Sequence, residues 1–192
     1  PFELTRNVPD HLKAFYKNEV HSMLELEPPK HTRLRGLVMR AFTSRRIREL
    51  EPDILELSNH LINEFPSEPF DLITLYANKI PVIIIARLLG VPEDMTDQLL
   101  KWSNDMVSMY QARRNREIED QAVKSCEEFV SFMQFYINEK RKKPGDDLIT
   151  HLLQAEQEGD KLSTDELIAT CILLLNAGHE ATVHTLGNGV KT

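Results

Sequence analysis

The 192-residue chain is 41% apolar and 28% charged and carries a net charge of −7, which fits one soluble domain with a sizeable core and argues against general affinity for nucleic acid. Its longest apolar stretches, residues 80–91 and 167–178, hold about a dozen residues each and are too short to span a membrane, and its N-terminus has no signal-peptide pattern. Cys126 and Cys171 are too few for a disulfide framework, so we expect a reducing, cytoplasmic location.

Almost the whole chain has the residue pattern of helices. Apolar residues recur at helical spacing, and the breaks between the periodic stretches fall at proline, glycine and turn-forming residues. A short strand is expected at residues 70–73. We therefore predict a mainly α fold with little or no sheet, in a single incomplete domain over residues 1–192, with helices at residues 30–42, 44–65, 74–89, 93–109, 115–142, 147–157 and 163–190.

The first predicted helix begins a strongly basic stretch. Between Lys30 and Arg48 there are seven Lys or Arg residues and no acidic residue. His31 and Arg35 stand four residues apart, so they share one helical face, and a paired imidazole and guanidinium suit a bound carboxylate. By spacing alone, a solvated basic helix with internal ion pairs is the favoured alternative. The case for nucleic-acid binding is weaker still, because no aromatic residues are interleaved with the charges.

The last predicted helix begins at a capping box, Ser163 to Glu166, and is apolar on nearly every side before residue 176. This pattern predicts a helix packed on all sides, the longest or second longest of the protein. Burying Glu180 in such a helix is costly unless it is paired or neutralised, and Gly178 costs roughly 1 kcal/mol relative to Ala. Two violated folding rules at one place indicate a functional site.

These two segments together resemble the cytochrome P-450 family of bacterial haem-thiolate monooxygenases. Residues 28–35 and 41–43 resemble an early helix of that family, and residues 177–180 resemble the oxygen-binding segment of its long central helix. The order and separation of the segments also agree. The resemblance covers nearly the whole chain but only about half of a complete member, and it implies a partial cytochrome P-450 fold ending after the central helix.

The resemblance implies haem b as the cofactor of the full-length parent. His31 and Arg35 would bind its propionates, and Ala177 and Gly178 would let the flat ring and dioxygen approach the helix backbone. Substrates would be small hydrophobic organic molecules. An acidic ferredoxin or flavodoxin would deliver electrons at the basic face formed by residues 30–48.

The resemblance further implies that Glu180 relays protons during oxygen-bond cleavage. The family usually places Thr directly after this acid, whereas this chain has Ala181 there and Thr182 one residue later. One position turns a side chain by about 100° around a helix, so Thr182 does not simply replace the usual hydroxyl. Water or a substrate hydroxyl would then deliver protons, with Glu180 and Thr182 as the candidate catalytic residues.

The chain departs from the family by lacking its axial ligand, a Cys in a Gly-rich loop, and its Glu-x-x-Arg helix. Cys126 and Cys171 both fall within predicted helices, so we assign both as structural and expect no metal ligand and little or no haem in this chain alone. His179 and His184 are five residues apart, about 140° around a helix, which does not fit a zinc-protease pair.

These features predict a fragment of a haem-dependent monooxygenase that inserts one oxygen atom from dioxygen into an organic substrate. Because the chain has no initiator Met, we expect it to begin partway through a gene product. The alternative is a non-catalytic helical module, a truncated remnant that acts by binding another protein. Whether this chain alone is an enzyme depends on a thiolate ligand that it does not contain.

Overall fold

The computed structural model describes residues 8–157 and 159–191, apart from the side chains of residues 44–46, 156 and 157. This part is helical except for loops and one antiparallel ribbon, β1 (Glu156–Gln157) and β2 (Asp160–Lys161). The predicted mainly α fold is therefore confirmed. None of the described helices is long and apolar enough to cross a membrane.

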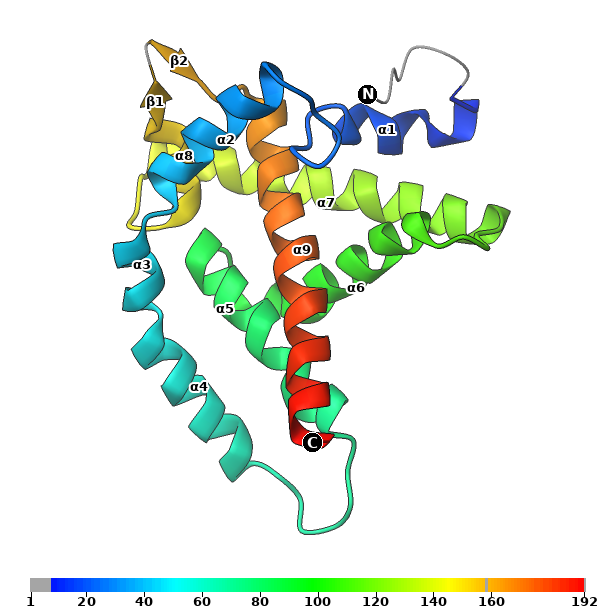
Figure 1. Ribbon diagram of the computed structural model, residues 1–192, viewed down its shortest axis with the longest axis vertical. Coiled ribbons are helices and arrows are strands. Elements are labelled where there is room, and N and C mark those ends of the chain that lie inside the picture. Colours follow the sequence, from blue (N-terminus) through cyan, green and yellow to red (C-terminus); the bar gives the residue numbers. More distant parts are fainter. Residues whose placement is uncertain (1–7, 158, 192) are drawn as a thin grey trace.

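The helices follow one another along the chain, with a long loop between α4 and α5 (Figure 1). The longer ones are α1 (Lys13–Glu19), α2 (Lys30–Ala41), α3 (Ser44–Glu49), α4 (Glu51–Asn63), α5 (Lys79–Leu89), α6 (Thr96–Val107), α7 (Arg116–Lys142), α8 (Leu148–Gln154) and α9 (Thr164–Lys191). Single helical turns are η1 (Asp10–Leu12), η2 (Ile73–Ala77), η3 (Glu93–Met95) and η4 (Ser108–Tyr110).

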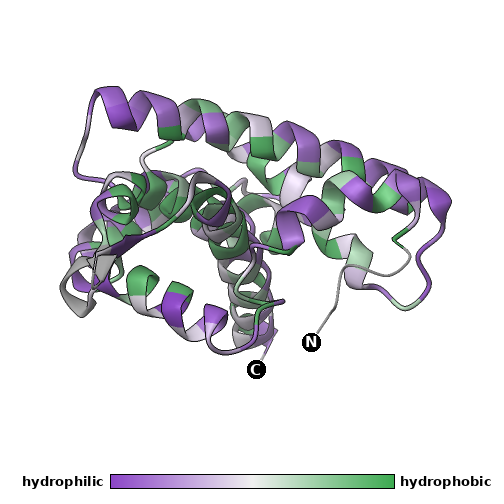
Figure 2. Ribbon diagram, turned by 90° about the horizontal axis from the view of Figure 1, so that it is seen from above, coloured by the Kyte–Doolittle hydropathy of each residue, from purple (hydrophilic) through white to green (hydrophobic). Residues whose placement is uncertain are grey.

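Helix α9 runs through the middle of the molecule, and α5, α6 and α7 pack against it (Figure 1). It has 28 residues and α7 has 27, which confirms the prediction that the last helix is the longest or second longest. Large side chains such as Phe129, Leu148 and Leu167 are fully buried between these helices. Figure 2 shows hydrophobic ribbon turned toward the interior of the bundle and hydrophilic ribbon toward its outside.

Three of the described helices, α7, α8 and α9, begin at a side-chain cap. Ser163 Oγ accepts a hydrogen bond from the Glu166 N–H at 3.2 Å, and Glu166 Oε2 accepts one from the Ser163 N–H at 2.8 Å. The predicted capping box of α9 is thus confirmed. Asn115 caps α7 and Asp147 caps α8 in the same way, each accepting a backbone N–H bond of 2.9 Å.

Three expectations about elements were wrong, and one helix was not predicted. The helix expected at 44–65 is divided into α3 and α4, because Pro52 lies in the first turn of α4 and suits a helix start rather than an interior. The strand expected at 70–73 is absent from the described residues. Asp71 instead accepts hydrogen bonds from Ile73 N and Thr74 Oγ1, at 2.9 and 2.6 Å, and begins the helical turn η2. The helix expected at 147–157 ends at Gln154 and leads into β1, and α1 had no predicted counterpart.

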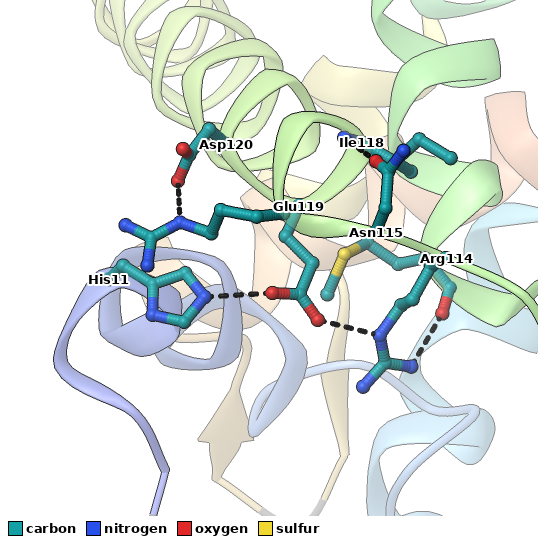
Figure 3. A network of polar contacts seen from close by, with 8 residues as sticks. His11, Arg114, Asn115, Ile118, Glu119 and Asp120 are labelled. Carbon is teal, nitrogen blue, oxygen red and sulfur yellow. Dashed lines mark hydrogen bonds and ion pairs between the residues drawn. The ribbon is translucent and has the colours of Figure 1, made fainter.

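A polar cluster ties the beginning of the described chain to the start of α7 (Figure 3). His11 Nε2 lies 2.8 Å from Glu119 Oε2, and Arg114 Nε donates to Glu119 Oε1 at 3.0 Å. Arg114 Nη1 also donates to the carbonyl of Met109 at 2.9 Å. Hydrogen bonds from His11 and Arg114 hold the pKa of Glu119 below its usual value. The cluster joins segments that are 108 residues apart.

Candidate functional site

An apolar groove with a volume of about 590 Å³ runs between α4, α5 and α9 and reaches Phe42 at the end of α2. Its walls are almost entirely aliphatic, among them Ile54 of α4, Ile84 and Leu88 of α5, and Leu174 of α9. The groove is an open hollow that residues far apart in the sequence create together, and its lining suits a hydrophobic partner surface or ligand.

Three predicted site residues on α9 line this groove: Ala177, Gly178 and Thr182. A Cβ atom on Gly178 would lie 2.9 Å from Cδ1 of Ile85, so the missing side chain lets α5 approach α9 closely. The hydroxyl of Thr182 donates to the Gly178 carbonyl at 2.8 Å. Because the proton of this hydroxyl is donated to the helix backbone, its oxygen can only accept a hydrogen bond from a group in the groove.

Glu180 was expected in a helix packed on all sides, and that expectation is wrong within this chain. From Leu167 to Leu175 every α9 residue is buried or half-buried, but beyond that point only one face stays covered, with His179 and Val183 buried. The side chain of Glu180 is 55% exposed, and its Oε1 lies 3.7 Å from Nε2 of His184. No described element covers this side of α9, and a helical pattern alone does not reveal how many neighbours a helix has.

His179 is a buried polar residue that the sequence motifs did not single out as part of the core. It is only 4% exposed, and burial holds its pKa below the usual value. Its place in the repeat Leu175, His179, Val183, at four-residue spacing, could have indicated that its face is the buried one.

On α2, His31 is half-buried and Arg35 is exposed. They share the predicted helix face, but neither lines the apolar groove. Within residues 8–157 and 159–191, no ion pair or hydrogen bond involves either side chain. Arg33 differs, because it pairs with Asp160 and Glu166. The ion pairs of Arg33 are thus internal to the protein, but their acidic partners lie on β2 and α9 and not on α2.

The two cysteines lie in the core, Cys126 on α7 and Cys171 on α9, and both are free thiols. Burial raises the pKa of each to about 12. Both thiols are therefore protonated near neutral pH and lie away from the groove lining, so neither fits the role of a thiolate ligand.

Comparison with known proteins places these features in a family. The family model "Cytochrome P-450" matches residues 5–190. The putative cytochrome P-450 YjiB of Bacillus subtilis is 39% identical over 175 residues, which cover 88% of this chain and 44% of that protein. Vitamin D(3) 25-hydroxylase of Pseudonocardia autotrophica is 41% identical over 170 residues, covering 88% of this chain and 40% of the enzyme.

Solved structures agree with the sequence matches. Ligand-free cytochrome P-450 TbtJ1 is 34% identical with a TM-score of 0.83, covering 92% of this chain and 47% of that one. P-450BioI, in complex with acyl carrier protein ligated to hexadec-9Z-enoic acid, is 28% identical with a TM-score of 0.89, covering 96% and 47%. The chain spans less than half the length of these relatives. It belongs to the cytochrome P-450 family.

Proposed function

We propose that this chain is the helical part of a haem-dependent monooxygenase that inserts one oxygen atom from dioxygen into a small organic substrate. The observation that carries the proposal is the position of Ala177, Gly178 and Thr182 along one side of an open apolar groove, in a chain whose family match runs over residues 5–190. In the parent enzyme, further chain would cover the groove and the exposed face of α9, with haem between that chain and α9.

The residues present fit one wall of a haem site. On α2, exposed Arg35 and half-buried His31 make no polar contact within the described part of the chain, and both can donate charge-assisted hydrogen bonds to propionates. On α9, the small and exposed Ala177 allows close approach to the backbone, beside Gly178, against which Ile85 of α5 packs. The axial thiolate would come from elsewhere in the parent, because both cysteines here are buried and protonated. Bound haem would supply the activation of dioxygen.

Glu180 would move protons toward the oxygen-binding side of α9. Its carboxylate is reachable from solvent in this chain, and it would be enclosed once the rest of the parent covers α9. Thr182 would accept a hydrogen bond, because its own proton is donated to the Gly178 carbonyl. With Ala181 at the family's usual Thr position, water or a substrate hydroxyl would complete the path between Glu180 and the reacting oxygen.

The substrate would be a small hydrophobic molecule, since relatives of this chain include a vitamin D(3) 25-hydroxylase and a mycinamicin IV hydroxylase/epoxidase. Electrons would come from an acidic ferredoxin or flavodoxin in the cytoplasm. The basic stretch from Lys30 to Arg48 would attract it, with exposed Arg40 rather than Arg33, which is paired, or Arg35, which would bind a propionate.

The test uses the full-length parent. We expect it to give the reduced, carbon-monoxide-bound spectrum of thiolate-ligated haem and to form a hydroxylated or epoxidised product when supplied with an acidic ferredoxin and its reductase. Arg35→Ala should weaken haem retention by removing charge-assisted hydrogen bonds worth about 1.5–3 kcal/mol each. A parent that binds no haem would refute the enzyme proposal and favour the non-catalytic helical module.

A further inference from the structure

Helices α2 and α9 are joined by a cluster of charges at the beginning of α9. Arg33 Nη1 on α2 donates to Asp160 Oδ2 on β2 at 3.0 Å, and Arg33 Nη2 pairs with Glu166 Oε1 on α9. The other oxygen of Glu166 accepts from the Ser163 N–H at 2.8 Å. One guanidinium therefore connects α2 to both the ribbon and the first turn of α9, across 127 and 133 residues of sequence.

The geometry of this cluster is more restrictive than that of an ordinary surface ion pair. The side chain of Glu166 is 15% exposed and that of Arg33 is 35% exposed, so solvent screens the pair less than a fully exposed one. The capping box already holds the Glu166 carboxylate, and the planar guanidinium offers its donors in fixed directions. The cluster therefore restrains both the distance and the orientation of α2 relative to α9.

The position of Arg33 on α2 makes it relevant to the proposed haem contacts. Arg33 is two residues from both His31 and Arg35, about 200° around the helix. A third face, formed by Leu34, Leu37, Val38 and Ala41, is buried in the core. This stripe decides which side of α2 turns inward, but apolar burial is non-directional and leaves small rotations of the helix open. The ion pairs of Arg33 supply that directional restraint.

We propose that Arg33 is a positioning residue for the propionate-binding pair His31 and Arg35. By pairing with Glu166 and Asp160, it fixes the rotation of α2 against α9, and the rigid helix α9 extends this restraint to Ala177, about 16 Å further along its axis. This inference rests on the proposed function, because it concerns the same haem site. It explains why one arginine of the basic stretch is paired while its neighbour Arg35 makes no polar contact in the described part.

The experiment measures the rate of haem loss from the full-length parent to excess apomyoglobin, together with the thermal midpoint. The variants are Arg33→Ala, Arg33→Lys, Arg35→Ala and the double variant at 33 and 35. The matched control is Arg141→Ala, because Arg141 is exposed and its Nη2 also donates to the first turn of α9, at Thr164 Oγ1 over 2.6 Å, but from α7 rather than α2.

We expect Arg33→Ala to speed haem loss about tenfold, as a lost charge-assisted hydrogen bond at Arg35 would. Arg33→Lys should restore part of the retention, and Arg141→Ala should leave it unchanged. With Arg35 already replaced, Arg33→Ala should speed haem loss by a smaller factor than it does alone, because only the positioning of His31 is then left to lose.

The positioning role would be overturned if Arg33→Ala speeds haem loss by the same factor with Arg35 present and with Arg35 replaced. It would also be overturned if Arg141→Ala speeds haem loss as much as Arg33→Ala does. Either result would leave the haem proposal intact. Unchanged haem loss in Arg35→Ala would refute the propionate role itself, and with it the positioning role. If Arg33→Ala does not fold, Glu166→Gln replaces it, because the amide oxygen keeps the cap but loses the charge. Glu166→Gln should speed haem loss in the same way, and normal retention in that variant would overturn the proposal.

Discussion

Gly90 shows how a single residue can be required by a close approach. It ends α5 with φ +77°, in the left-handed region, and a Cβ atom there would lie 2.5 Å from Cβ of Asp147. Asp147 cannot give way easily, because it caps α8 and pairs with Lys140 at 2.7 Å while only 7% exposed. Backbone conformation and packing therefore both exclude a side chain at position 90.

Gly90→Ala should lower the free energy of unfolding of the full-length protein by about 2–4 kcal/mol, combining left-handed strain with overpacking. Gly159→Ala is the matched control: Gly159 has φ +82° but no atom within 4 Å of the added Cβ, so only about 1–2 kcal/mol of strain applies. Urea denaturation measures both variants. Equal losses would show that the contact with Asp147 contributes nothing.

Glu180→Gln should leave haem and substrate binding in the parent intact while product formation falls by about 10²–10⁴-fold, the range for general acid–base groups. His184→Ala is its control, since it removes the 3.7 Å contact to Glu180 but keeps the carboxylate. Product formed per electron consumed and the thermal midpoint are measured for both. If Glu180→Gln resembles His184→Ala, with lower stability and normal turnover, Glu180 is a structural partner and not a proton relay.

Two glutamates join the first helices of the described chain, η1 and α1, to the rest of the molecule, and their pKa values are shifted in opposite directions. Glu119 of α7, in the cluster of Figure 3, has a lowered pKa because His11 and Arg114 hydrogen-bond to it. Glu19 of α1 is buried, which raises its pKa, and Tyr110 donates to its Oε2 at 2.8 Å. The same segment should therefore respond to pH in two opposing ways.

A lowered pKa in the folded state means that the stability contributed by Glu119 is present above the ordinary pKa of a glutamate and is lost as pH falls through the folded value. Glu119→Gln should destabilise the protein near pH 7, with a smaller effect at about pH 4. Glu19 has a raised pKa, so its contribution is present at acid pH and is lost as pH rises. The free energy of unfolding of Glu19→Gln, relative to that of the unsubstituted protein, should therefore rise as the pH increases toward neutral. Denaturation midpoints from about pH 4 to neutral pH measure both, and parallel profiles would contradict the opposing shifts.

The described part of the molecule is a helical bundle whose apolar surface is uncovered on one side, at the groove between α4, α5 and α9. The groove between α4, α5 and α9 is open, and Ala177 and Thr182 on the adjoining part of α9 are exposed. An apolar surface of this kind is normally covered by further protein or a ligand. The chain itself spans less than half the length of each relative named above.

The isolated chain should not produce the reduced, carbon-monoxide-bound spectrum of thiolate-ligated haem when haem is added. Both thiols are buried, and their pKa values are raised to about 12, so neither is available as a thiolate. Absorption spectroscopy of the reduced chain measures this directly, with the full-length parent as the positive control. A thiolate spectrum that disappears in Cys126→Ser or Cys171→Ser would show that one of these residues is a ligand.

Local sequence signals determined most of the elements of this protein. Helical periodicity located α7 and α9 to within a residue or two, and the capping box at Ser163 and Glu166 formed as expected, because a cap involves residues three apart. The two motifs around His31 and Gly178 also sufficed to indicate the family. Pro52, whose effect is equally local, marked a helix start that periodicity alone concealed.

Which helix faces are covered, and which charged side chains meet, depends on tertiary packing. The buried position of His179, the exposure of Glu180 and the pairing of Arg33 with Glu166 all depend on elements distant in the sequence. A helical pattern shows which residues share a face but not how many neighbours pack on it. Burial, and hence the electrostatics of a carboxylate, depends on those neighbours. For Glu180, they are absent from the described chain.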